Sequence, residues 1–104
     1  MIYTVTFNPA IDYVVHTDAM TVGDVNRSSG EEIYFGGKGI NVSMVLKELD
    51  VPSRALGFLA GFTGTAIEQG LQADGIDTDF VHLDAGFTRI NVKIKAGTET
   101  ELNG

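Results

Sequence analysis

The residues most clearly suited to binding a ligand are the seven at positions 36 to 42. They read Gly-Gly-Lys-Gly-Ile-Asn-Val and lead into a helical pattern. Amide groups at a helix N-terminus attract anions, and glycine lets a ligand approach the backbone closely. The cluster therefore predicts a loop that brings its backbone, Lys38 and Asn41 to a polar ligand. The alternative is a tight turn that holds no ligand, and a glycine cluster alone does not separate the two.

Two nucleotide-binding interpretations of this cluster are excluded because its residues do not match the motifs. A phosphate-binding loop of the Walker type needs glycine at position 32, which is Glu32, and serine or threonine at position 39, which is Gly39. A dinucleotide-binding turn needs a third glycine or alanine at position 42, which is Val42. The nature of the polar ligand therefore stays open at this point.

Four side chains could complete such a site. Asp12 comes shortly after Asn8-Pro9, at the C-terminal end of a predicted core strand, where ligands bind in open α/β sheets and a carboxylate can accept hydrogen bonds from sugar hydroxyls. Asn41 can both donate and accept, which suits neighbouring hydroxyls. Arg27 and Arg89 carry the guanidinium fork that clamps phosphate. The plainer alternatives are a turn aspartate, a polar residue at a helix start, and solvated surface charges.

Composition limits the function classes. The chain has 104 residues, of which 43% are hydrophobic and 20% charged, so that it forms one globular unit at most. A net charge of −7 disfavours nucleic-acid binding, because a phosphate backbone would be repelled. There is no cysteine, and His16 and His82 are far apart, so we expect no disulfide, no metal centre and no histidine-based catalytic triad. Without a signal-peptide pattern or a long apolar stretch, we expect a cytoplasmic protein with no membrane contact.

Hydrophobic periodicity predicts a core in which strands and helices alternate. Apolar residues at i, i+3, i+4 and i+7 predict a helix whose apolar stripe is formed by Val42, Val45, Leu46 and Leu49. The capping-box spacing Thr65-x-x-Glu68 predicts a second helix from about Thr65 to Ala73. Core strands are expected at residues 2–7, 54–59 and 80–83. The order strand, helix, strand implies a parallel crossover.

Less hydrophobic strand patterns predict a second, more exposed sheet, which we call the lid. Its strands are expected at residues 11–17, 27–35, 89–95 and 98–102. Because core and lid patterns interleave along the chain, they are expected to form parts of one unit rather than consecutive domains. The expected core segments are about 1–10 and 36–86, and the expected lid segments are about 11–35 and 87–104.

Four motifs in this order resemble one family. They are Asn-Pro-Ala-Ile-Asp at 8–12, Gly-Gly-Lys-Gly-Ile-Asn-Val-Ser at 36–43, Phe-Thr-Gly at 62–64 and Thr-Arg-Ile-Asn-Val-Lys at 88–93. The chain is similar over all its 104 residues to the N-terminal part of the ribokinase-like (PfkB) sugar kinases. The last motif, followed by Glu-Thr-Glu-Leu-Asn-Gly, favours the 1-phosphofructokinases within that family over the tagatose-6-phosphate kinases.

The resemblance implies an α/β/α sandwich with a small β-sheet lid. The implied activity is phosphorylation of fructose 1-phosphate to fructose 1,6-bisphosphate, with ATP and Mg²⁺ as cofactors of the full-length enzyme. By matching positions, the sugar would be contacted by Asp12, Gly36, Gly37, Lys38 and Asn41. Arg89 would help to hold the phosphate, and Arg27 is a less direct match because the lid varies within the family.

Two departures from the family pattern bear on activity. Many relatives have arginine at position 44, where this chain has Met44. The family's catalytic aspartate lies in a late Gly-Ala-Gly-Asp motif, and Gly23-Asp24, which follows Thr-Val, does not match it. The resemblance therefore implies that this chain holds the acceptor site and most of the lid, without a catalytic base, an ATP pocket or a metal site, and is inactive alone.

Two interpretations of the short chain follow. It is either a fragment of a kinase whose activity needs the full polypeptide, or a stand-alone module that binds a sugar phosphate or dimerises. The lid segments each offer one apolar face, formed by Ile11, Tyr13 and Val15, by Ile33 and Phe35, and by Ile90, Val92 and Ile94. Two predicted helices can cover the core sheet but leave none for the lid, so we expect a homodimer through the lid.

Overall fold

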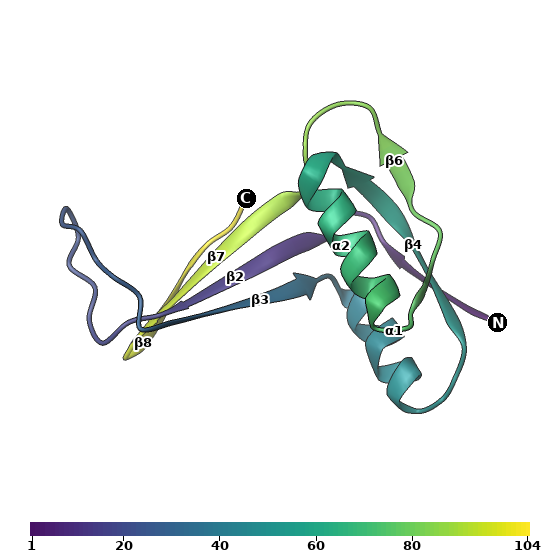
Figure 1. The fold of residues 1–104 in the computed structure, drawn as a ribbon, viewed down its shortest axis with the longest axis horizontal. Coiled ribbons are helices and arrows are strands. Elements are labelled where there is room, and N and C mark those ends of the chain that lie inside the picture. The colour runs from purple at the N-terminus through teal and green to yellow at the C-terminus, as the bar shows by residue number, and fades with distance from the viewer.

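The computed structural model describes residues 1–104 and contains two β-sheets and two α-helices, with the lid sheet extending away from the helices (Figure 1). The first sheet is the core sheet and has the strand order β1-β4-β5, with β6 also paired to β4. The second is the lid sheet and has the order β3-β2-β7-β8. In chain order the elements are β1 (Ile2–Thr6), β2 (Ala10–His16), β3 (Gly30–Gly36), α1 (Lys38–Glu48), β4 (Ser53–Ala60), α2 (Gly61–Ala73), β5 (Asp77–Thr78), β6 (Val81–Leu83), β7 (Arg89–Ala96) and β8 (Thr98–Leu102).

Both helices pack on the same face of the parallel core sheet. On β1 the side chains that point to α1 are Thr4, which shares a 2.7 Å hydrogen bond with Ser43, and Thr6. Their register partners on β4 share this face with the buried Leu59, which packs with Ile67 of α2. The complete cluster of buried apolar side chains joins α1, β4 and α2 and consists of Ile40, Ala55, Leu59, Ile67, Leu71, Ile76 and Phe80.

The opposite face of the core sheet is apolar and exposed. Phe7 is 75% exposed and Val5 is 52% exposed, and the rings of Phe7 and Phe58 stack with their centroids 6.2 Å apart. A shallow apolar hollow of about 320 Å³ runs over this face between β1, β4 and β6. Parallel sheets in α/β proteins are normally covered on both faces, so this surface lacks the cover that such a sheet usually has.

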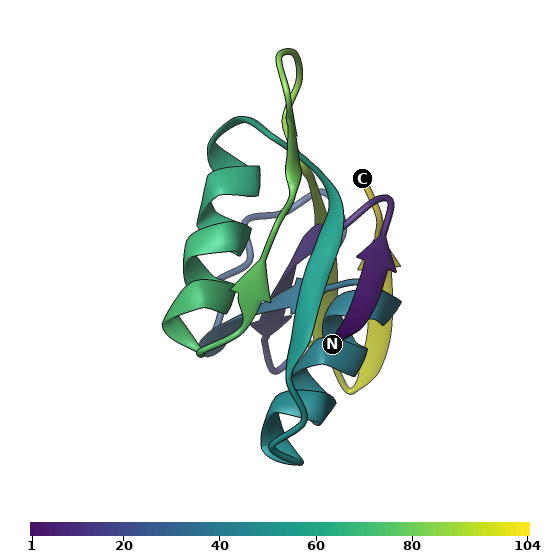
Figure 2. The same ribbon diagram turned by 90° about the vertical axis from the view of Figure 1, so that its right-hand side faces the viewer.

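The lid sheet is mixed, and its two faces differ in polarity. Strand β2 pairs antiparallel with β3 and parallel with β7, and β8 folds back antiparallel on β7. Asp12 is the register partner of Tyr34 and Asn91, and these three side chains lie on one, polar face. Tyr13 is the register partner of Ile33 and Val92 on the other, apolar face. The view in Figure 2 shows the lid strands passing behind the core sheet and its helices.

The predicted helix after the glycine cluster exists, but its predicted apolar stripe is largely exposed, and only Leu46 of its four residues is partly buried. Val42, Val45 and Leu49 are exposed, with Val45 at 54%, and the residues that α1 buries are Ile40 and Ser43. The reason lies in two contacts with β1: the Ile40 amide donates a hydrogen bond to the Thr6 hydroxyl, and the hydroxyls of Thr4 and Ser43 share another, which fixes the side of the helix that meets the sheet. The stripe of Val42, Val45 and Leu49 is therefore a second exposed apolar surface.

The predicted second helix begins four residues earlier than expected, and the capping-box interpretation is wrong. Helix α2 starts at Gly61 directly after β4, and the Thr65 hydroxyl donates to the carbonyl of Gly61 inside the helix. Thr88 fixes the early start, since its carbonyl accepts from the Thr63 hydroxyl at 2.7 Å and its hydroxyl accepts from the Ala60 amide. Phe80 is also not in a strand: it is buried between the short strands β5 and β6.

The expectation that no helix covers the lid is wrong at the base of the lid. Ile11 and Phe35 pack against the buried core cluster. A Cβ placed on Gly70, in the middle of α2, would collide with the ring of Phe35. Helix α2 thus packs on both sheets, and only the outer part of the apolar lid face remains uncovered.

Candidate functional site

The glycine cluster is the place where α1 closes onto the end of β1. Gly37, which precedes the helix, has φ = 136°, a conformation that favours glycine. A Cβ on Gly39 would lie 2.5 Å from the hydroxyl oxygen of Thr6 and 2.6 Å from the carbonyl oxygen of Val5. The Thr6 hydroxyl accepts a 3.1 Å hydrogen bond from the amide of Ile40 and so satisfies one first-turn donor of α1. Two of the glycines therefore serve the close contact between α1 and β1.

Gly36 makes room for the carboxylate of Asp12. A Cβ placed on Gly36 would lie 2.5 Å from Asp12 Oδ2, so the carboxylate fills the space that a side chain would take. Gly36 is the register partner of Ala10, two residues before Asp12 on the same strand. The glycine cluster and Asp12, which the sequence predicted as separate parts of one site, are thus in direct contact.

Asp12 is held from its other side by a residue of β7. Asn91 Nδ2 donates a 3.1 Å hydrogen bond to Asp12 Oδ1, and Asn91 Oδ1 accepts a 3.1 Å hydrogen bond from the amide of Gly104. Asn91 is buried. The motif 88–93 contains this asparagine, but sequence reasoning singled out only its arginine, because nothing in the spacing indicates that residues 12 and 91 are neighbours.

Arg89 lies one row closer to the core on the same polar face of the lid. It is the register partner of Ala10, and its Nη2 donates a 3.2 Å hydrogen bond to the carbonyl of Asn8. Its Nε is buried and has no hydrogen-bond partner. A buried guanidinium nitrogen without a partner is costly.

Lys38 and Asn41 stand in the first turn of α1, where the sequence predicted Asn41 to be. Both side chains are exposed, and the amide of Asn41 donates to the carbonyl of Gly37 at 2.9 Å. The first turn begins two residues after Gly36, the glycine that makes room for the Asp12 carboxylate. Near the base of the lid the chain thus has a hydrogen-bond acceptor in Asp12, an amide that can donate and accept in Asn41, and a cation in Lys38.

Arg27 is not brought to this group. It lies in the loop at the far end of the lid, where its carbonyl accepts a hydrogen bond from the Thr17 hydroxyl. Its side chain lines a groove of about 290 Å³ with Val15, Val92 and Ile94, which are on the apolar face of the lid. Within one chain, Arg27 and Asp12 are therefore on opposite faces of the same sheet.

Comparison with known proteins places this arrangement in a family. Residues 5–103 match the family described as pfkB family carbohydrate kinase. The chain is 56% identical to a 1-phosphofructokinase of Bacillus subtilis over 104 residues, which are 100% of this chain and 34% of that protein. It is 44% identical to a D-tagatose-1-phosphate kinase of Bacillus licheniformis over 102 residues, 98% of this chain and 33% of that protein.

The chain belongs to the pfkB family of carbohydrate kinases. It spans about a third of the length of the relatives that it matches. A crystal structure from Staphylococcus aureus, named as a candidate phosphofructokinase, superposes with a TM-score of 0.94 at 53% identity and covers 100% of this chain and 34% of its own. Phosphofructokinase-2 from Escherichia coli, in complex with substrates and products, shares the fold with a TM-score of 0.86 at 24% identity, over 97% of this chain and 34% of its own. The prediction of a ribokinase-like α/β fold is confirmed.

The polar lid face of this pfkB chain continues beyond Asp12 as a row of hydrogen-bonded side chains. The Tyr34 hydroxyl donates to Glu32, and His16 Nε2 lies 2.5 Å from Glu32 Oε1. The hydrogen bond from Tyr34, and next the one from His16, hold the pKa of Glu32 below its usual range. Lys93 and Lys95 lie 3.7 Å and 3.8 Å from glutamates of β8, so their charges are paired across the lid.

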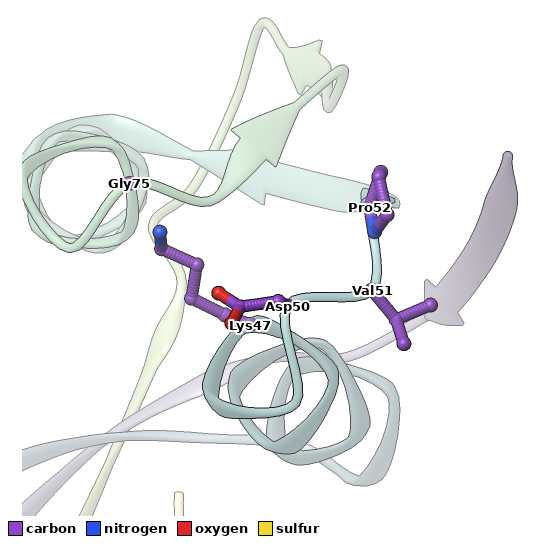
Figure 3. Close-up of a pocket in the computed structure, with 5 residues that line it drawn as sticks. All are labelled: Lys47, Asp50, Val51, Pro52 and Gly75. Carbon is purple, nitrogen blue, oxygen red and sulfur yellow. The ribbon is translucent and has the colours of Figure 1, made fainter.

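Another hollow of this pfkB chain lies away from the Asp12 carboxylate. A hollow of about 230 Å³ lies at the opposite end of the core sheet, between the C-terminal ends of α1 and α2 (Figure 3). It is lined by Lys47, Asp50, Val51, Pro52 and Gly75, and the Lys47 side chain reaches across it toward Gly75. No group of three or more histidine or acidic side chains is placed to hold a metal ion. No helix has the length and apolar character needed to cross a membrane.

Proposed function

We propose that this chain is the sugar-phosphate-binding part of an ATP-dependent kinase that phosphorylates fructose 1-phosphate to fructose 1,6-bisphosphate. The observation that carries the proposal is the Asp12 carboxylate, fixed between Gly36 and Asn91 beside the first turn of α1. The 56% identity to a 1-phosphofructokinase supports the choice of sugar.

Each site residue has a role that its position supports. The Asp12 carboxylate and the Asn41 amide bind the sugar hydroxyls, and the backbone at Gly36 and Gly37 lets the sugar approach the start of α1. Arg89 holds the phosphate of the sugar with its guanidinium group. Lys38 adds a positive charge that offsets the net negative charge of the chain around an anionic substrate. The chain thus orients the acceptor hydroxyl for phosphoryl transfer.

Membership in the pfkB family implies ATP as the phosphoryl donor, with Mg²⁺ as its usual companion. The residues of this chain do not fit either group. No cluster of acidic side chains could hold the metal, and the hollow in Figure 3 offers one lysine and one aspartate, both at the C-terminal end of α1, rather than amides at a helix start. We therefore propose that the nucleotide site and the catalytic base belong to further segments of a longer polypeptide.

Two exposed apolar surfaces support this longer polypeptide. The bare face of the core sheet carries Phe7 and Phe58, and the outer stripe of α1 carries Val42 and Val45. Further segments of a protein three times as long can cover both surfaces. In such a protein we propose that residues 1–10 and 36–86 belong to the core and that residues 11–35 and 87–104 belong to the lid. The alternative, a stand-alone binding or dimerising module, would leave both surfaces in water at a cost of about 25 cal/mol for each Å² of apolar area.

We also propose a homodimer that forms through the outer, apolar face of the lid. Ile33 is 61% exposed there, and the groove lined by Val15, Val92 and Ile94 lies on the same face. A two-fold axis would place this face against its copy. Arg27 lines the same groove, so a phosphate contact by Arg27 would have to be made to the site of the partner subunit.

A second candidate substrate is a tagatose phosphate. The sequence motifs leave tagatose 6-phosphate as the alternative substrate to fructose 1-phosphate. The relative at 44% identity is a D-tagatose-1-phosphate kinase. Fructose and tagatose differ in the configuration of one hydroxyl-bearing carbon, so the discrimination depends on which hydroxyls Asp12 and Asn41 contact.

The test compares the chain with the family-length polypeptide that contains it. ADP formation is measured with ATP, Mg²⁺ and, in turn, fructose 1-phosphate, tagatose 1-phosphate and tagatose 6-phosphate. We expect the long polypeptide to have its highest kcat/KM on fructose 1-phosphate and the 104-residue chain to match a no-enzyme control. A higher kcat/KM on either tagatose phosphate would contradict fructose 1-phosphate as the substrate. Turnover by the purified 104-residue chain would contradict the proposal that the catalytic base and the nucleotide site lie in further segments.

A further inference from the structure

We propose that Asn91 is a positioning residue that sets the orientation of the Asp12 carboxylate. The inference depends on the proposed function only for what Asp12 binds. Asn91 lies on β7 directly across from Asp12 on β2, and Asn91 is only 8% exposed. A buried side-chain amide must satisfy its donor and acceptor within the protein, so its partners are fixed by the fold.

The two partners of Asn91 leave its amide one orientation. The Gly104 amide is a donor and needs Asn91 Oδ1 at 3.1 Å, which turns Nδ2 toward the Asp12 carboxylate at 3.1 Å. A flipped amide would set its oxygen against a carboxylate oxygen and its NH₂ group against an N–H group, which replaces two hydrogen bonds by two repulsions. The hydrogen bond from the Gly104 amide therefore fixes the orientation in which Asn91 Nδ2 donates to Asp12.

Asp12 is consequently held at both of its oxygens. Oδ1 accepts from Asn91, and Oδ2 occupies the space that Gly36 leaves by having no side chain. An amide is a neutral donor, so it orients the carboxylate without adding a cation that would compete with a sugar hydroxyl as donor. Each carboxylate oxygen has a further acceptor position, which remains for the ligand.

Two substitutions of Asn91 separate its two contacts. Asn91→Asp keeps an oxygen for the Gly104 amide and, at a pH where both carboxyl groups are ionised, replaces the donor to Asp12 by a second carboxylate oxygen. Asn91→Leu removes both contacts while keeping a similar volume. Gln69→Glu, on the exposed side of α2, makes the same amide-to-acid change away from the site and controls for net charge.

The first measurement needs no ligand. Three-bond couplings of the Asp12 side chain, measured by NMR on the 104-residue chain, should report one χ1 rotamer in the wild type and in Gln69→Glu. They should report averaging between rotamers in Asn91→Asp and Asn91→Leu. If Asp12 keeps the same single rotamer in a folded Asn91→Asp protein, the proposal is overturned, and amide spectra of the same samples establish that the variant is folded.

The second measurement is a double-mutant cycle on the affinity for fructose 1-phosphate. Asn91→Asp should weaken binding by tenfold or more, and by less than twofold when Asp12→Ala is already present, because Asn91 acts through Asp12. A merely structural role predicts the same loss in both backgrounds and would overturn the proposal. If the wild type binds no fructose 1-phosphate while the Asp12 couplings change as expected, the proposed substrate fails and the positioning role stands.

Discussion

Gly70→Ala should destabilise the protein, although alanine is the better helix former. In the middle of an exposed helix this change is worth about 1 kcal/mol of stability. Here a Cβ would collide with the ring of Phe35, which is the contact that joins α2 to the lid. The ring would have to swing away and lose its packing on the buried core cluster, and such overpacking typically costs about 1–3 kcal/mol. The overpacking cost less the gain in helix propensity leaves an expected net loss of up to about 2 kcal/mol.

The sign of this effect depends on Phe35, which makes the prediction sharp. In a Phe35→Ala background the added Cβ meets no ring, so Gly70→Ala should then stabilise the protein by about 0.5–1 kcal/mol. Urea unfolding of the four proteins, followed by the circular dichroism of the helices, measures both differences. If Gly70→Ala stabilises the protein in the presence of Phe35, the lid does not pack on α2 as described.

Three further changes test separate parts of the structure. Thr6→Val keeps the methyl group beside Gly37 but removes the acceptor for the Ile40 amide, so it should cost about 1 kcal/mol and raise hydrogen exchange at that amide, whereas Thr4→Val should leave the exchange unchanged. Val92→Asp should shift the chain from dimer toward monomer in sedimentation across a concentration series, and a strictly monomeric wild type would refute the lid interface. Glu32→Gln should lower the melting temperature at pH 7 but not at low pH. The fold lowers the pKa of Glu32, so its contribution is complete above its unfolded pKa of about 4.3 and is lost as pH falls through the folded value. A temperature difference that stays constant from pH 7 to pH 3 would contradict the role of Glu32.

The strands and the parallel crossover could be predicted from the sequence because their signals are local. Strand patterns predicted strands at residues 89–95 and 98–102, and the structure confirms both: β7 is one residue longer and β8 has the predicted bounds. Periodicity also gave α1, but not the side that packs on the sheet. That side is decided by the hydroxyls of Thr4 and Thr6, which look unremarkable within a run of β-branched residues.

The residues of the candidate site were proposed from the sequence by type, but their contacts were not. Glycine, lysine, asparagine and aspartate were recognised by type, and Arg89 by its fork of donors. Nothing in the sequence indicates that the Asp12 carboxylate fills the space beside Gly36, or that Asn91 lies across from Asp12, because the two residues are 79 positions apart. The start of α2 was missed for the same reason, since it is set by Thr88 from a distant part of the chain.

The central claim is that this chain carries the sugar-phosphate site, and calorimetric titration with fructose 1-phosphate tests it most directly. We expect saturable binding at one site, weakened in Asp12→Ala by about 1.5–3 kcal/mol, or roughly 10- to 150-fold, because a charged hydrogen-bond acceptor is lost. Asp18→Ala, which removes the same charge from the exposed end of the lid, should bind like the wild type. Equal affinities of the wild type and Asp12→Ala would contradict the claim.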